Sequence, residues 1–307
     1  MERVKRDIER LKRERKAVIL AHNYQIPEVQ DVADFLGDSL DLSLRAAKTE
    51  AKVIVFCGVH FMAETAAIVC PDKLVIMPDI TAGCPMAAMV DAERLRRAKE
   101  RHPEAIVVSY VNTTADVKAE SDICCTSANS VEVARAVLSG DGKRPILFVP
   151  DKYLGSWTEE QVGRKFILWD GHCHVHVRIL REHLEERKRE HPDAAVMVHP
   201  ECRPEVRELA DYILSTGGMV KLPQRVGVRK FVVGTEVGII YRLKRLYPDR
   251  EFIPATELAV CPNMKKTTLE KVLWALEELR EPVEVPQEIA SRARRAIERM
   301  LSIPRRA

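Results

Sequence analysis

Three short apolar runs rich in β-branched residues recur along the chain, and each one ends in a polar side chain. The runs cover residues 18–22, 106–110 and 195–199 and end at His22, Tyr110 and His199. Short buried runs of this kind are typical of parallel strands that are covered on both faces. The pattern therefore predicts three central strands, each in its own sheet.

Two further apolar runs follow each central run. The second runs lie at 53–58, 146–150 and 231–234, and the third runs lie at 74–77, 166–169 and 251–254. Segments with a helical period separate them, and repeated strand–helix–strand units build parallel sheets with right-handed crossovers. We therefore predict an α/β protein made of three homologous αβα domains, each with a small parallel sheet.

Polar and reactive side chains recur with the same long period. Cys84, Cys173 and Cys261 are 89 and 88 residues apart. Three further sets repeat at 88 or 89 residues: Ser39, Ser127 and Ser215; His22, Tyr110 and His199; and Tyr24, Asn112 and Glu201. A fixed period of this length indicates a repeated structural unit. The three units are expected in a pseudo-threefold arrangement around one central active site, to which each contributes equivalent residues.

The repeat divides the chain into three domains, each small but able to form a core. We place them at residues 1–84, 85–172 and 173–264. Two amphipathic helices are predicted within residues 265–307. We expect them to pack back on the first domain and complete it.

Charge is dense but balanced, with 49 basic and 46 acidic residues and a net charge of +3. This balance argues against nucleic acid or a membrane surface as the main partner, whereas a small anion needs only a local positive field. The N-terminus has no apolar signal core, and no run approaches the ~20 apolar residues that span a bilayer. We therefore expect a cytoplasmic protein.

The eight cysteines are expected to be buried, metal-bound or catalytic rather than disulfide-paired in a reducing compartment. Cys84 and Cys261 each begin a Cys-Pro-x-Met sequence, and proline is favoured at the first position of a helix. A thiol at a helix N-terminus is expected to have a lowered pKa, which suits metal ligation. The cysteines outside the period are interpreted as structural: Cys57, Cys70, Cys124, Cys125 and Cys202.

Ser39 and Ser127 each stand just before a helix-like run, so both fit N-cap positions. A helix N-terminus also binds carboxylate or phosphate through its free N–H groups and its dipole. Capping and ligand binding are alternatives for the same hydroxyl, and the sequence leaves both open. In the third copy, either Ser215 or Thr216 could reach the ligand.

Three thiolates that converge on an axis can hold three irons of a four-iron cluster, whereas a cluster ligated only by protein needs four cysteines. The open iron could then act as a Lewis acid on a hydroxyl or carboxylate oxygen. Glu201 and Tyr24 at the same centre could serve proton transfers. Alternatively, the three histidines of the segment 171–176 could form a zinc site with Cys173.

Nearly the full chain resembles quinolinate synthase. The motifs that carry the resemblance are, in order, His22-Asn23-Tyr24-Gln25, Gly37-Asp38-Ser39, Cys84-Pro85-Met86, Tyr110-Val111-Asn112, Thr126-Ser127-Ala128-Asn129, Gly171-His172-Cys173, His199-Pro200-Glu201-Cys202, Ser215-Thr216-Gly217 and Cys261-Pro262-Asn263-Met264-Lys265-Lys266. The resemblance implies a [4Fe–4S] cluster at the centre of three αβα domains. It also implies a dehydrating condensation of iminoaspartate with dihydroxyacetone phosphate to quinolinate, with loss of phosphate and water, in NAD biosynthesis. These small anionic substrates imply a functional link to an enzyme that produces iminoaspartate.

The resemblance also implies roles for individual residues. The cluster ligands are Cys84, Cys173 and Cys261. The substrate-binding set is His22, Ser39, Tyr110, Val111, Asn112, Ser127, His199, Pro200, Glu201 and Thr216. The catalytic set is Tyr24, Glu201, His22 and Tyr110, with Tyr24 and Glu201 as the acid/base pair.

Two features depart from the family pattern. Some members carry a Cys-x-x-Cys-x-x-Cys run at the last cluster cysteine, whereas this chain has only Cys261, which argues against a redox switch. His174 replaces a proline that often follows the middle cysteine, which affects the local turn rather than the ligand.

Two other functions stay open on the sequence. One is a zinc-dependent hydrolase that uses Cys173 with His172, His174 or His176. The other is a non-catalytic protein that binds small anions at the centre of the repeat. Tightly bound zinc would favour the first, and release of every ligand unchanged would favour the second.

Overall fold

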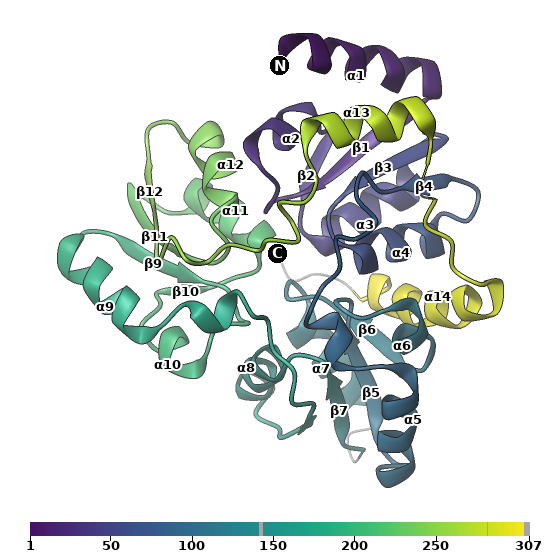
Figure 1. The fold of residues 1–307 in the computed structure, drawn as a ribbon. Coiled ribbons are helices and arrows are strands. Elements are labelled where there is room, and N and C mark those ends of the chain that lie inside the picture. Colours follow the sequence, from purple (N-terminus) through teal and green to yellow (C-terminus); the bar gives the residue numbers. More distant parts are fainter. Residues whose placement is uncertain (141–143, 281, 304–307) are drawn as a thin grey trace.

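Three parallel sheets form the framework of the molecule (Figure 1). The structure is a computed structural model and describes residues 1–140, 144–280 and 282–303. Each sheet has four strands, in the orders β2-β1-β3-β4, β6-β5-β7-β8 and β10-β9-β11-β12. The predicted α/β class with three αβα units is confirmed. The three units, called here the first, second and third in chain order, form a triangle in Figure 1. The exact domain boundaries stay a prediction.

The strands predicted from the apolar runs are all present. The central strands are β1 (Ala17–His22), β5 (Ile106–Tyr110) and β9 (Ala195–Val198). The second strands are β3 (Val53–Cys57), β7 (Ile146–Val149) and β11 (Lys230–Gly234), and the third are β4 (Leu74–Ile76), β8 (Ile167–Leu168) and β12 (Glu251–Pro254). The edge strands β2 (Phe35–Gly37), β6 (Ile123–Cys125) and β10 (Tyr212–Ile213) are not among the predicted apolar runs.

Helices cover both faces of each sheet. In the described residues they are α1 (Glu2–Arg15), α2 (Pro27–Val32), α3 (Ser39–Lys48), α4 (His60–Val69), α5 (Ala92–Arg101), α6 (Ala115–Ala119), α7 (Ser130–Gly140), α8 (Lys152–Val162), α9 (Arg181–Glu190), α10 (Pro204–Arg207), α11 (Thr216–Arg225), α12 (Ile239–Leu246), α13 (Leu269–Glu278) and α14 (Gln287–Leu301). Short 3₁₀ turns lie at Ala87–Met89 and His176–Arg178. Side chains of β1 alternate between two cores: Val18 and Leu20 join one, and Ile19 and Ala21 the other. Alternation with burial on both faces explains why these strands are apolar throughout.

The two C-terminal helices pack on different units. α13 lies against α1 and β3 of the first unit, as expected. α14 packs mainly on α6 and β6 of the second unit and also touches α4 of the first, so the expectation that it packs on the first unit is wrong in the main (Figure 1). Its buried stripe of Ala293, Ala296, Ile297 and Met300 belongs to a core shared by the first two units. Residues 281 and 304–307 of the predicted 265–307 segment lie outside the described residues.

An aspartate at the same place in each unit ties the edge strand to the central strand. The carboxylates of Asp34, Asp122 and Asp211 accept the backbone N–H of Ile19, Val107 and Val196 at 2.8, 2.8 and 2.7 Å. The backbone N–H of each aspartate donates back to the carbonyl of the same strand residue. The aspartate therefore fixes the register of the short edge strand, which has few ladder bonds of its own.

In the described part of the chain, no helix combines the length and the apolar composition needed to cross a membrane.

We predict that Asp122→Ala lowers the free energy of unfolding by about 1 kcal/mol, because it removes a charge-assisted hydrogen bond to a strand N–H. Denaturant unfolding of the metal-free protein measures the change. Asp116→Ala, at an exposed position of α6, is the matched control and should stay within about 0.5 kcal/mol of the parent. Equal stability of Asp122→Ala and the control would contradict the role of this aspartate.

Candidate active site

Most of the predicted site residues line one cavity between the three units. The empty space of the cavity, with the open solvent at its mouth included, is about 720 Å³. All predicted residues except Val111 and Pro200 line it: His22, Tyr24, Ser39, Cys84, Tyr110, Asn112, Ser127, Cys173, His199, Glu201, Thr216 and Cys261. Val111 donates its N–H to the carbonyl of Cys125, and the carbonyl of Pro200 accepts from Arg207. Each of these residues lies at the carboxyl end of a strand, in the loop that follows it or at the first residue of the next helix, as is typical of parallel α/β sites.

The thiols of Cys84, Cys173 and Cys261 all face this cavity and are partly buried. Burial raises the pKa of the Cys84 thiol to about 12, and the neighbouring Cys261 adds to the rise. Burial also raises the pKa of Cys173 well above its usual value, with contributions from Glu201 and Cys84. Burial also raises the pKa of Cys261. The lowered pKa expected for Cys84 and Cys261 is therefore wrong, because burial outweighs the backbone N–H groups at the turns. The three thiols therefore line one cavity in their protonated form near pH 7.

His22 and His199 present the same imidazole edge to the cavity. Nδ1 of His22 accepts the N–H of Tyr24 at 3.2 Å, and Nδ1 of His199 accepts the N–H of Glu201 at 3.3 Å. These bonds assign the ring proton to Nε2, which in His199 lies 3.2 Å from Oγ of Ser127. Burial lowers the pKa of each imidazole to about 3. Both rings are therefore neutral hydrogen-bond donors near pH 7.

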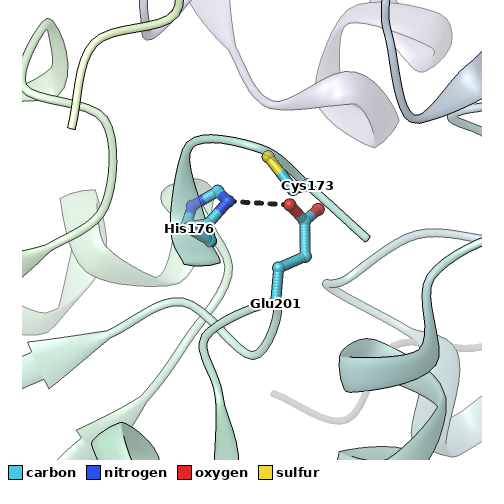
Figure 2. A group of neighbouring side chains, drawn as sticks. All are labelled: Cys173, His176 and Glu201. Atoms are coloured by element: carbon cyan, nitrogen blue, oxygen red, sulfur yellow. Dashed lines mark ion pairs between the residues drawn. The ribbon is translucent and has the colours of Figure 1, made fainter. Parts of the chain in front are cut away.

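Glu201 is the ionised centre of the site. Tyr110 donates its hydroxyl to Oε1 at 2.6 Å, and Nδ1 of His176 lies 2.8 Å from Oε2. Burial alone would raise the pKa of this carboxyl, but the imidazole of His176 and the hydroxyl of Tyr110 outweigh it and lower the pKa. Figure 2 shows the Cys173 thiol, the His176 ring and the Glu201 carboxylate gathered together, and their ligand atoms lie within 4.8 Å of one another.

A chain of hydrogen-bonding groups connects Glu201 to Tyr24. Nε2 of His176 lies 2.8 Å from Oγ1 of Thr235, and Oγ1 lies 2.5 Å from the hydroxyl of Tyr24. Burial and the negative charge of Glu201 raise the pKa of Tyr24 well above its usual value, so its hydroxyl is protonated near pH 7. The site thus joins a protonated phenol to an ionised carboxylate through Thr235 and His176.

Sequence reasoning did not assign His176 or Thr235 to this chain of contacts. His176 stands three residues after Cys173, and the equivalent positions after Cys84 and Cys261 are Ala87 and Met264. A search for repeated polar residues therefore passes over it. His176 was considered only as a zinc ligand, and of the three histidines near Cys173 it is the one grouped with that thiol.

The residues at the N-termini of the helices show which side chains cap a helix and which face the cavity. Asp38, not Ser39, caps α3, since its carboxylate accepts the N–H groups of Leu40 and Asp41. α7 begins at Ser130, three residues after Ser127. Of the two alternatives that the sequence leaves open, neither Ser39 nor Ser127 therefore takes the N-cap position. Both hydroxyls face the cavity instead.

In the third unit, Ser215 caps α11 and Thr216 lines the cavity. Ser39 and Thr216 are thus the equivalent first residues of α3 and α11. In the third unit, the residue that lines the cavity therefore lies one position after the serine predicted by the period. Nδ2 of Asn23 donates to Oγ1 of Thr216 at 2.9 Å. This bond occupies an acceptor site on Thr216 and leaves its hydroxyl proton for a ligand.

Arg207 holds the loop that carries Glu201. Its buried guanidinium donates to the carbonyls of Pro200 and Cys202, on either side of Glu201, at 3.4 and 2.9 Å. It also reaches the second unit, where it binds the carbonyl of Tyr153 and pairs with Glu160 at 2.9 Å. Because the loop and α8 share one cation, the position of Glu201 depends on contact between the second and third units.

Comparison with known proteins identifies the relatives of this chain. Residues 6–302 match the family described as quinolinate synthetase A protein. A quinolinate synthase of Dehalococcoides mccartyi (strain CBDB1) is 55% identical over 98% of this chain and 99% of the relative. Those of Thermodesulfovibrio yellowstonii and Methanosarcina barkeri are 53% and 52% identical, over 95% and 96% of this chain and 96% of each relative.

We predict that Arg207→Met lowers the free energy of unfolding by about 3 kcal/mol, because it leaves buried carbonyls without a donor. Denaturant unfolding measures the loss. Arg203→Met is the control, since the Arg203 side chain is 39% exposed, and it should cost no more than about 0.5 kcal/mol. A loss below about 1 kcal/mol for Arg207→Met would show that the loop does not depend on this cation.

Proposed function

The chain belongs to the quinolinate synthase family, and we propose that it condenses iminoaspartate with dihydroxyacetone phosphate to quinolinate. Phosphate and water leave in this reaction, which belongs to NAD biosynthesis. The observation that carries the proposal is the convergence of three cysteines, each from the segment after the last strand of one sheet, on the cavity that also contains Glu201 and Tyr24. The zinc hydrolase and the non-catalytic binding protein are not favoured by the relatives.

The donor set of the cavity fits a [4Fe–4S] cluster held by Cys84, Cys173 and Cys261. Three thiols on one cavity match in number the three cysteine-ligated irons of such a cluster. When bound, the cluster would supply a Lewis-acidic iron at the corner that has no cysteine. His176 and Glu201 lie beside Cys173, so the acid–base groups of the chain border the cluster position.

The remaining cavity suits small anions. Hydroxyls of Ser39, Ser127 and Thr216 line it from the three units, and α3 and α11 point their N-termini at it. Neutral His22 and His199 add N–H donors without a permanent charge. Carboxylate and phosphate oxygens accept from donors of this kind. We assign these residues to hold the two substrates in a reactive orientation.

Asn112 gives the cavity an acceptor. In the described part of the protein its side-chain oxygen has no hydrogen-bond partner although it is buried. An orphaned buried acceptor favours a ligand with an N–H or O–H group at this point. The amino or imino nitrogen of the first substrate, or a hydroxyl of the second, meets this requirement.

Tyr24 and Glu201 are assigned as proton donor and proton acceptor. Tyr24 is protonated and Glu201 is ionised near pH 7, so each starts in the state that its role requires. A proton that leaves the Tyr24 hydroxyl can be replaced through Thr235 and His176. Tyr110, hydrogen-bonded to Glu201 at 2.6 Å, can pass a proton to that carboxylate from the other side of the cavity.

We further propose a cytoplasmic location, which suits an oxygen-sensitive cluster and a biosynthetic role. The proposal includes a functional link to an enzyme that produces iminoaspartate, because an imine of this kind hydrolyses in water. Nucleic acid and membranes are not proposed as partners, since the surface charge is balanced.

The first test of the function is anaerobic formation of quinolinate. We predict product from the parent protein and a loss of at least about 100-fold in each of Cys84→Ser, Cys173→Ser and Cys261→Ser, because each variant removes one cluster ligand. Cys70→Ala is the matched control, since Cys70 does not line the cavity, and it should keep its activity. Full activity in any of the three serine variants would exclude that cysteine as a ligand.

A second prediction concerns the chain of groups behind Tyr24. Thr235→Val should lower kcat about 100-fold and change KM less than about threefold, because it removes a proton-relay hydroxyl without changing side-chain shape. Thr235→Ser should recover most of the loss. Steady-state kinetics under anaerobic conditions measure both. Equal kcat values for Thr235→Val and the parent would rule out the relay.

A further inference from the structure

A buried carboxylate holds the loop of the middle cluster cysteine. Asp151 is fully buried and stands at the N-cap of α8. Its Oδ1 accepts the N–H groups of Tyr153 and Leu154 at 2.9 and 2.7 Å. Its Oδ2 accepts the N–H of Cys173 at 3.1 Å. One oxygen therefore begins a helix, and the other fixes the backbone of a cluster ligand.

The third unit contains the same arrangement with a longer side chain. Glu236 is fully buried, and its Oε1 accepts the N–H of Cys261 at 3.0 Å. Its Oε2 accepts the N–H of Gly238, just before α12, at 2.8 Å. Lys265 lies 2.8 Å from Oε1 and compensates the buried charge.

Backbone contacts show that the two carboxylates occupy equivalent positions. The residue after each donates its N–H to the carbonyl two residues before the cysteine, from Lys152 to Gly171 at 2.9 Å and from Val237 to Ala259 at 3.0 Å. In the first unit the same bond runs from His60 to Ala82 at 2.8 Å. The residue before His60 is Val59, whose side chain has no acceptor for the N–H of Cys84.

We propose that Asp151 and Glu236 are positioning residues that hold the Cys173 and Cys261 loops ready for the cluster and retain the cluster once it is bound. The inference rests on the proposed cluster. Residues that orient metal ligands from behind typically change metal affinity 10- to 100-fold when mutated. A buried hydrogen bond to a backbone N–H is costly to lose, which suits this role. Preordered loops also lose less entropy when the ligands bind.

Asp151→Asn separates this role from helix capping. Asparagine caps helices as well as aspartate does, and its single oxygen satisfies two N–H groups by facing Tyr153 and Leu154. The NH₂ group then faces the N–H of Cys173, so donor opposes donor and only the anchor is lost. Asp91→Asn is the matched control, because Asp91 caps α5 by accepting the N–H of Arg94 and does not line the cavity.

The experiment measures release of iron from the anaerobically purified protein to a ferrous chelator, followed by the cluster absorbance. Asp151→Asn should lose iron at least about tenfold faster than the parent, while Asp91→Asn should match the parent. The metal-free Asp151→Asn protein should melt only a few degrees below the parent, because the helix cap is kept and one hydrogen bond, to the N–H of Cys173, is lost. Glu236→Gln should also accelerate release, and it decides the question if Asp151→Asn fails to fold.

The results separate this inference from the function on which it rests. A parent protein that holds iron, with Asp151→Asn and Glu236→Gln releasing it at the parent rate, would overturn the positioning role and leave the cluster in place. A parent protein purified without iron or sulfide would overturn the cluster and the positioning role together.

Discussion

The site depends on one geometric constraint: all strands within a sheet run parallel, so the loops that follow them lie at the same edge. Each of the three sheets turns this edge toward a common cavity. In the third unit, the loop after β9 supplies Glu201, the start of the helix after β10 supplies Thr216, and the loop after β12 supplies Cys261. Repetition of the same order in each unit explains how residues nearly 90 positions apart become neighbours.

Within this repeated framework, the chemistry comes from the positions where the units differ. Burial of a carboxylate destabilises the fold unless the carboxylate has hydrogen-bonding or charged partners. Glu201 is hydrogen-bonded to Tyr110 of the second unit and paired with His176 of the third. Tyr24 of the first unit joins the same set through Thr235. The ionised centre therefore requires side chains from all three units. The first two units share a core with α14, whereas the third unit has separate cores, so the contacts at Glu201 are also where the third unit meets the rest.

The sequence predicted the parts of the fold and the site that recur. Apolar runs located β1, β5 and β9, and the shared period placed the three cysteines and Glu201 on one cavity. It could not predict features that have no periodic signal. His176 and Thr235 lack polar equivalents, and the contacts of α14 depend on which groove its small residues fit. The N-cap of α3 is Asp38, one residue before Ser39, and the sequence pattern does not resolve so small a difference. The raised pKa of Cys84 depends on burial, which only the folded chain shows.

The central claim is that three cysteines from three units share one cluster and leave one iron without a thiolate. Mössbauer spectroscopy of the ⁵⁷Fe-enriched, anaerobically purified protein tests it most directly. We expect about a quarter of the cluster signal to shift when quinolinate is added, while the signal of the cysteine-bound irons stays unchanged. A protein without cluster iron, or a cluster whose irons all remain unchanged by the ligand, would contradict it.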